Sequence, residues 1–202
     1  MARPRAATYD DQRAQILQAA ATLFAQRGYT AATMKEVAAA CGISKATLYH
    51  YFSDKHQLLS HITNDHVQRL EALVAAVHQQ ALAPHERLRA LILQFVQAYA
   101  GAATAQRVLT EDMKFLEPAV RTAVEDGQRR VVQAFADAVA ALRPDLQASL
   151  HKPLAMLLFG MINWTFTWLR PEGALSHEDL APVVVELYLS GIQGLLQRGA
   201  AP

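Results

Sequence analysis

One segment of this 202-residue chain, between Thr33 and Lys55, constrains the fold most because it encodes two short helices joined by a tight turn. Thr33 is followed three residues later by Glu36, the pattern of a capping box, so a helix is expected to start there. Gly42 suits the left-handed conformation that ends a helix, and Ser44 suits the N-cap of the next one. A helix, a glycine turn and a short second helix predict a helix-turn-helix, whose second helix enters the major groove of DNA.

The second helix, from Lys45 to about Phe52, is predicted to present a polar face opposite its one large aliphatic residue, Leu48. A helix turns by about 100° per residue, so the side chains opposite Leu48 offer methyl, hydroxyl, phenol and imidazole groups that can contact base edges. Lysines at the edges of this face would meet phosphates. An ordinary helical hairpin with a polar surface would show the same pattern. The predicted DNA-binding residues are Thr33, Ser44, Lys45, Ala46, Thr47, Tyr49, His50 and Lys55.

This region resembles a segment of a known protein family. The stretch that starts at Ile43, ISKATLYHYFSDKHQLL, is similar to the recognition-helix segment of the tetracycline-repressor (TetR) family of transcriptional regulators. The family's first two helices resemble the preceding stretch, which starts at Ile16 and contains Leu23-Phe24 and the Arg27-Gly28-Tyr29 break. The resemblance implies a dimeric regulator, most often a repressor, that binds a palindromic operator and is released by a small effector.

Composition is consistent with an all-α fold. Of the residues, 52% are hydrophobic and 18% charged, with 9 Gly and 8 Pro, which favours a helix-rich globular chain over disorder. No alternating strand pattern is evident. We therefore expect an N-terminal three-helix helix-turn-helix DNA-binding domain over residues 1–56 and a helical ligand-binding and dimerisation domain over residues 57–202. The boundary falls inside a long fourth helix, predicted from Asp54 to Gln80.

Charge is distributed unevenly along the chain. Residues 1–56 carry 7 Lys or Arg against 4 Asp or Glu, whereas residues 57–202 carry 12 against 14. The small basic surplus coincides with the helix-turn-helix, where phosphates would be met. Arg3 and Arg5 suggest a short arm that touches the DNA backbone or minor groove, although a frayed terminus is an equally good interpretation.

The longest uncharged segment runs from Leu154 to Leu169. It is shorter than the ~20 residues that span a bilayer, so we expect a helix that is buried on all sides, which in so small a chain requires a second subunit. No membrane partner is expected. The N-terminus lacks the apolar core of a signal peptide, and the single cysteine, Cys41, interpreted as a small core residue, fits a reducing cytoplasm.

The chain shows no catalytic or metal-binding constellation, so we expect neither an enzyme nor a cofactor. His56, His61 and His66 are spaced by five and turn away from one another on a helix, whereas two zinc ligands would need a spacing of four. Glu111 and Asp112 fit a solvated helix face better than an acid–base pair. A helical DNA-binding protein without a ligand is one alternative, but DNA binding alone would not require the large aromatic-bearing C-terminal region.

The C-terminal region carries two further signals. Gly160, Gly191 and Gly194 would allow close approach of the last two helices, which in the TetR family pair with those of a second subunit; a homodimer is therefore expected. Aromatic and sulfur-containing side chains are frequent, and the family has a ligand cavity between its central helices. The predicted ligand-binding residues are Phe95, Tyr99, Met113, Phe115, Arg121, Arg129, Phe135, Asn163 and Trp164.

A second resemblance concerns the effector. The stretch from Gly160 to Leu180, GMINWTFTWLRPEGALSHEDL, is similar to one in TetR-family regulators of fatty-acid, aromatic-acid and steroid breakdown, several of which respond to acyl-coenzyme A thioesters. Arg121, Arg129 and Arg130 are candidates to meet coenzyme A phosphates, although arginines so spaced are usually surface charge. Multidrug-responsive members are the alternative, and they would favour acidic groups such as Glu111 or Asp112 in the cavity.

Overall fold

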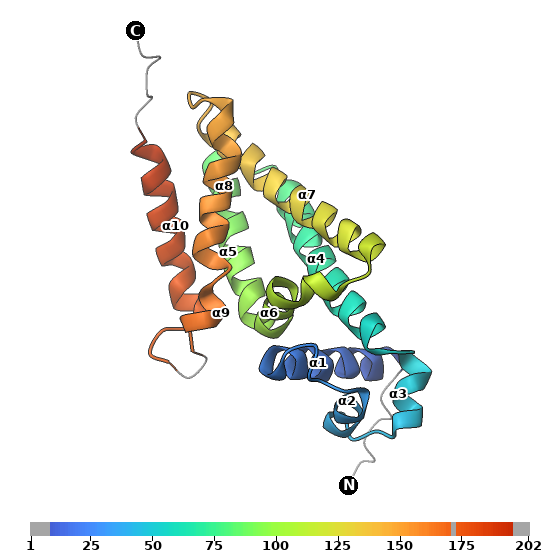
Figure 1. Ribbon diagram of the computed structural model, residues 1–202. Helices are drawn as coiled ribbons and strands as arrows, with labels where there is room; N and C mark the ends of the chain where they lie inside the picture. Colours follow the sequence, from blue (N-terminus) through green and yellow to red (C-terminus); the bar gives the residue numbers. More distant parts are fainter. Residues whose placement is uncertain (1–8, 171–172, 196–202) are drawn as a thin grey trace. The chain divides into compact units, whose positions relative to one another are not determined.

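The computed structural model describes residues 9–170 and 173–195, and every regular element in these residues is helical (Figure 1). The predicted all-α class is therefore confirmed. The elements are α1 (Tyr9–Arg27), α2 (Met34–Ala40), α3 (Lys45–Tyr51), α4 (Lys55–His78), α5 (Pro84–Gly101), α6 (Ala103–Asp112), the 3-10 turn η1 (Met113–Phe115), α7 (Pro118–Leu142), α8 (Ala148–Ile162), α9 (Thr165–Trp168) and α10 (His177–Gln193).

The chain divides into two compact units. The head unit contains the described residues up to His66 together with Thr104–Val124, and the body unit contains Val67–Ala103 and the described residues from Glu125 onward. Helices α4 and α7 each run from the head unit into the body unit. The predicted boundary at residue 56, between the DNA-binding domain and the ligand-binding and dimerisation domain, stays a prediction.

The helix-turn-helix forms as the capping residues predict. The Thr33 hydroxyl accepts from the Glu36 backbone N–H while the Glu36 carboxylate accepts from the Thr33 N–H, which completes the capping box of α2. Gly42 follows with φ of 65°, in the left-handed region that glycine tolerates best. Ser44 caps α3 through the Thr47 N–H, and Leu48 is fully buried, so α3 is fixed in orientation.

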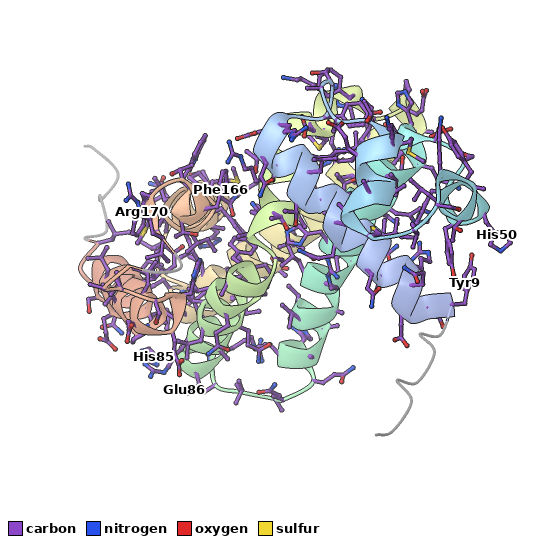
Figure 2. All side chains as sticks on the ribbon, turned by 90° about the horizontal axis from the view of Figure 1, so that it is seen from below. Tyr9, His50, His85, Glu86, Phe166 and Arg170 are labelled. Carbon is purple, nitrogen blue, oxygen red and sulfur yellow. The ribbon has the colours of Figure 1, made fainter. Side chains whose placement is uncertain are left out.

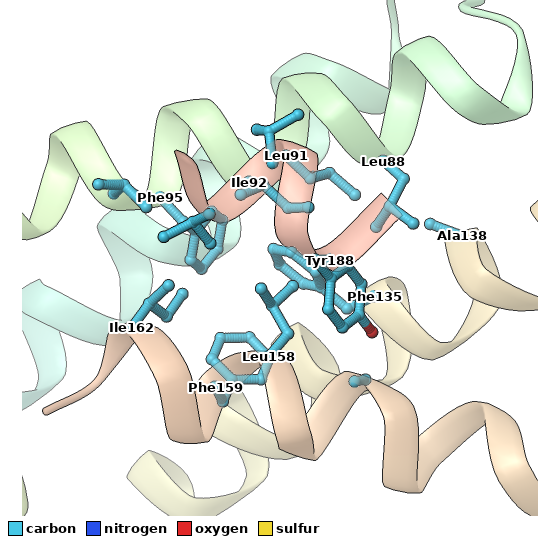
Figure 3. Packing of buried hydrophobic residues seen from close by; sticks show 14 of the residues in the cluster. Leu88, Leu91, Ile92, Phe95, Phe135, Ala138, Leu158, Phe159, Ile162 and Tyr188 are labelled. Atoms are coloured by element: carbon cyan, nitrogen blue, oxygen red, sulfur yellow. The ribbon is translucent and has the colours of Figure 1, made fainter. Parts of the chain in front are cut away.

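The body unit is built around aromatic packing between α5, α7 and α8 (Figure 3). The ring of Phe135 packs edge-on against Phe95, with ring centroids 4.8 Å apart, and against Phe159 at 4.9 Å. Helix α10 packs along α5 and contacts α8, where the Tyr188 hydroxyl donates to the Leu154 carbonyl at 2.7 Å. Burial of these large side chains is the main source of the unit's stability.

The uncharged segment is not the single helix that the sequence predicts, and its burial on all sides by a second subunit stays a prediction. Helix α8 ends at Ile162, and only the four-residue α9 follows after the break at Asn163 and Trp164. Its side chains also divide between two environments. Leu158 and Ile162 are buried in the core, whereas Met156, Leu157, Trp164 and Trp168 are exposed.

Helices α4 and α7 run in the same direction through the body unit and approach closely at Gly127. A Cβ atom added at Gly127 would lie 2.5 Å from Val67 Cγ1, so only glycine permits this contact. One turn further along, Arg130 Nε donates to Glu71 Oε1 at 2.5 Å. No helix in the described part of the chain is long and apolar enough to cross a membrane.

Candidate DNA-binding face and ligand-binding residues

The outer face of α3 carries the side chains that the sequence predicts. Lys45, Ala46, Thr47, Tyr49 and His50 are all exposed. Ala46 and His50 lie opposite the buried Leu48, Thr47 and Tyr49 flank them, and Lys45 lies at the edge of the face. The Lys45 ammonium lies 5.5 Å from the centre of the Tyr49 ring, which brings a cation and a phenol together at one edge. A short, capped helix with this set of groups has the donors and acceptors to contact both phosphates and base edges.

Thr33 and Ser44 act as caps. The Ser44 and Thr47 hydroxyls lie 2.8 Å apart, and the Thr33 hydroxyl donates to Glu36 Oε2 at 2.8 Å. Hydrogen bonds from Thr33, with a smaller contribution from the Arg27 charge, lower the pKa of Glu36 below its ordinary value. Both capping residues are exposed, and their predicted contacts with DNA stay predictions.

Lys55 has a different role from the predicted phosphate contact. Its ammonium donates to the carbonyl oxygens of Tyr29, Thr30 and Ala32 at 2.7, 3.2 and 3.0 Å, and it lies 4.3 Å from the Tyr29 ring centre. An ammonium group has three N–H donors, so these carbonyls use them all. Lys55 therefore ties the start of α4 to the α1–α2 connection.

Tyr9 belongs to the same surface but is not identified by the sequence patterns. Its ring stacks on Tyr51, with centroids 4.6 Å apart, and meets the His50 ring edge-on at 6.5 Å (Figure 2). The first residue of α1 thus extends the aromatic surface at the end of α3. Tyr9 lies 41 residues before His50 and 42 before Tyr51, so no short-range sequence pattern predicts these contacts. Arg3 and Arg5 lie outside the described residues.

Residues of α6 and η1 complete the head unit around Tyr29. Phe115 stacks on the Tyr29 ring at 5.2 Å, and the backbone N–H of Tyr29 hydrogen-bonds to the Asp112 carboxylate. Burial, followed by the nearby negative charges of Asp54, Asp112 and Glu117, raises the pKa of Tyr29 to about 12. Burial also raises the pKa of Asp112 above its ordinary value. Nearby, His66 Nε2 and Gln106 Oε1 lie 2.8 Å apart, joining α4 to α6.

The predicted ligand-binding residues lie in different parts of the described chain, and their contact with a ligand stays a prediction. Phe95 and Phe135 (Figure 3) and also Tyr99 are buried in the packed core of the body unit, whereas Met113 and Phe115 belong to the head unit. The sequence pattern does not separate a core aromatic from a cavity aromatic, because both lie on the apolar side of a helix.

The remaining members of that predicted set lie on the surface or at a helix end. Arg121 is exposed, and Arg129 pairs with Asp126 at 3.0 Å. Asn163 ends α8, and Trp164, 56% exposed, stacks on Phe166 at 6.2 Å. Contacts of any of these residues with a ligand stay predictions.

Two adjacent cavities are present in the body unit, and neither is lined by a residue from the predicted set. The larger has a volume of about 430 Å³ between α4 and α7, and the smaller has about 90 Å³ and also reaches α5. Their walls share Val74 and His78. Acidic side chains in the walls are Glu71 and Asp137; Glu111 instead pairs with Arg107 at 3.0 Å.

Comparison with known proteins covers nearly the whole chain. Residues 16–62 match the family model for bacterial regulatory proteins of the tetR family, and residues 81–192 match that for the tetracyclin repressor-like C-terminal domain. The transcriptional activator FasR of Mycolicibacterium smegmatis is 31% identical over 184 residues, with 91% of this chain and 84% of FasR covered. The transcriptional repressor KstR2 of the same organism is 27% identical over 189 residues, with 90% of each chain covered.

Solved structures agree with these relatives. A TetR-family transcriptional regulator from Bordetella parapertussis has a TM-score of 0.85 and 34% identity, with 94% of this chain and 100% of that chain covered. AibR, solved in complex with isovaleryl coenzyme A and operator DNA, has a TM-score of 0.75 and 28% identity, with 87% and 97% covered. With both parts of the chain matched in sequence and in fold, the protein belongs to the TetR family of transcriptional regulators.

Proposed function

We propose that the protein binds a palindromic operator as a homodimer and that an apolar effector, of the acyl-coenzyme A type, releases it and relieves repression. The observation that carries the proposal is the outer face of α3, where Lys45, Thr47, Tyr49 and His50 are exposed together on a capped helix. One short recognition helix covers few base pairs, so a two-fold dimer that places two of them in successive major grooves is the usual solution.

Two exposed apolar stripes in the body unit support the dimer. On α8, Leu157 is 64% exposed and lies in line with Gly160, and the exposed Trp164 follows just after the end of the helix. On α10, Leu187 is also 64% exposed and lies in line with Val183 and Gly191. A Cβ atom added at Gly160 or Gly191 would meet nothing within 4 Å, so both stripes are open to an incoming surface. Paired apolar helix faces of this kind favour a self-complementary interface with a second copy of the chain.

The effector class is supported by the relatives and by the cavities between α4 and α7. AibR was solved with isovaleryl coenzyme A, and a cavity of about 430 Å³ falls within the range that holds a drug-sized molecule. Release requires that the effector favour a conformation in which two recognition helices no longer match the DNA. Because α4 belongs to both units, a shift of α4 is the proposed transmission step.

A cationic drug is the second candidate effector. Its basis is the pair of carboxylates, Glu71 and Asp137, that line the two cavities. Glu71, however, already pairs with Arg130, and Asp137 Oδ1 accepts from Gln133 at 2.8 Å. We therefore favour an uncharged apolar group in these cavities over a cation. A DNA-binding protein without any ligand remains the third alternative, and it would leave both cavities without a function.

The DNA-binding part is tested by selecting bound duplexes from a random pool and measuring their affinity for variants. We expect inverted half-sites. Lys45→Ala should weaken binding to all DNA sequences alike, and it should reduce the salt dependence of the affinity by about one phosphate contact. Thr47→Ala and His50→Ala should change the preferred bases. Lys55→Met should lower the melting temperature instead, because three carbonyl oxygens lose their donor.

Unchanged base preference in both the Thr47→Ala and His50→Ala variants would contradict the assignment of this face. For Lys55, loss of DNA affinity without loss of stability would support the phosphate contact that the sequence predicts.

A further inference from the structure

Between α4 and α7 the body unit has a groove whose shape follows from the side chains on α7. The helices touch at Gly127 and are linked by the Glu71–Arg130 ion pair one turn further on. Beyond that pair, α7 lines the groove with Ala134, Asp137 and Ala138, and the small side chains of the two alanines leave room for the smaller cavity. The groove therefore has an outer part of about 430 Å³, which begins at the ion pair, and an inner part of about 90 Å³.

The outer part suits an apolar chain or ring. Val74, Ala75 and Val131 form its floor and walls, and Glu71, Arg130 and His78 lie around it. The inner part continues along Val77 and Leu91 and would hold about three groups of the size of a water molecule. A ligand that follows both parts must be narrow at its inner end.

Arg87, from the first turns of α5, lines the inner part. Its Nη2 donates to the Leu82 carbonyl at 3.1 Å, which fixes the guanidinium group. Its Nε is buried and has no hydrogen-bond partner among the described residues. A buried donor left in this state is destabilising, and an acceptor oxygen on a ligand in the cavity would remove that cost.

The charged side chains that line the inner part determine whether a neutral or an anionic ligand oxygen is preferred there. Asp137 lines the same small cavity as Arg87, so the attraction of the guanidinium for a ligand carboxylate or phosphate is offset by repulsion from the Asp137 carboxylate. A neutral carbonyl oxygen accepts from Arg87 without that repulsion. An uncharged oxygen therefore suits the Arg87 donor, whereas a second anion would also meet the Asp137 carboxylate.

From these contacts we infer that the groove between α4 and α7 binds an apolar molecule that places a neutral carbonyl oxygen against Arg87 Nε at its inner end. The inference deepens the proposed function and, for the acyl-coenzyme A class, rests on it. The preferred effector is then an oxygenated acyl group, with its coenzyme A part outside the groove.

The test uses the full-length protein without DNA and three thioesters of one chain length. Octanoyl-coenzyme A ends in a methyl group, 7-oxo-octanoyl-coenzyme A carries a ketone near its end, and octanedioyl-coenzyme A ends in a carboxylate. Calorimetric titration of the unsubstituted protein should show the oxo compound binding about tenfold more tightly than the octanoyl compound. The octanedioyl compound should bind most weakly of the three.

Two variants and one control assign the preference to a residue. Arg87→Met should remove the preference for the oxo compound, and Asp137→Asn should raise the affinity for the octanedioyl compound. Arg89→Met is the matched control: Arg89 lies on the same helix, pairs with Glu186 at 3.6 Å and lines neither cavity, so the preference should persist. Thermal melting of each variant verifies that it is folded.

Equal affinity of the unsubstituted protein for the oxo and octanoyl compounds would overturn the inference, as would a preference that survives Arg87→Met. A separate titration with 2-octanone distinguishes the site from the proposed effector class. If 2-octanone binds in an Arg87-dependent way and no thioester does, the Arg87 site stands and the coenzyme A part of the proposed function fails. If neither 2-octanone nor any thioester binds, the inference itself is wrong.

Discussion

Replacing Leu187 with aspartate is expected to turn the protein into a monomer and to reduce its operator affinity by at least about 100-fold. The Leu187 side chain is 64% exposed within one chain, so the substitution should leave the fold intact. In a dimer joined through α8 and α10 the same position would place a carboxylate in an apolar interface, where an unpaired charge is strongly unfavourable. Loss of the second recognition helix then removes the gain from simultaneous binding of two half-sites.

Sedimentation velocity and operator binding should be measured together for this variant. Leu157→Asp, at the equally exposed position on α8, should behave in the same way. Leu175→Asp is the control, because Leu175 is 39% exposed but precedes α10 and lies on neither stripe. Dimers of unchanged stability in both the Leu157 and Leu187 variants would mean that the two stripes serve some other purpose.

Replacing Phe135 with alanine should lower the free energy of unfolding by about 3–5 kcal/mol. Phe135 is fully buried and packs edge-on against two other phenylalanine rings, so its removal leaves a cavity that rigid neighbours cannot fill. Urea denaturation measures the change. Arg129→Ala, from the same predicted ligand-binding set but on the surface, should change the stability by no more than about 0.5 kcal/mol.

The outcome also decides between the two roles that the sequence leaves open for Phe135. If Phe135→Ala retains the stability of the unsubstituted protein and instead abolishes effector binding, Phe135 lines a cavity, and its position in the core has been misinterpreted. A large loss of stability places it in the packed core and leaves the groove between α4 and α7 as the candidate effector site.

Local signals in the sequence predict the helix-turn-helix well. The capping residues Thr33 and Ser44 each bond to a residue three positions along the chain, and Gly42 ends α2 through its own positive φ. Such short-range interactions fix helix ends and orientation with little help from the rest of the fold. The same short range applies to Ser176 and Asp179, which lie three residues apart and form the capping box of α10.

Long-range contacts explain where the sequence-based expectations fail. Lys55 is predicted at a phosphate because it is cationic and near α3, but its ammonium is used by three carbonyls about 25 residues away. Cys41 is half-buried rather than in the core. The cavity residues His78 and Arg87 carry no signal in the sequence, because a space between helices depends on small residues elsewhere, such as Ala134 and Ala138.

The central claim is that effector binding in the body unit and operator binding by α3 oppose each other, and one titration tests it directly. A labelled operator duplex, obtained from the selected pool, is bound to the protein and titrated with octanoyl- and 7-oxo-octanoyl-coenzyme A while fluorescence anisotropy is followed. Free coenzyme A and a cationic drug serve as the comparison compounds. We expect the thioesters to release the duplex, and by linkage the duplex must weaken thioester binding by the same factor. Release by the cationic drug alone, or no change with any apolar compound, would contradict the account.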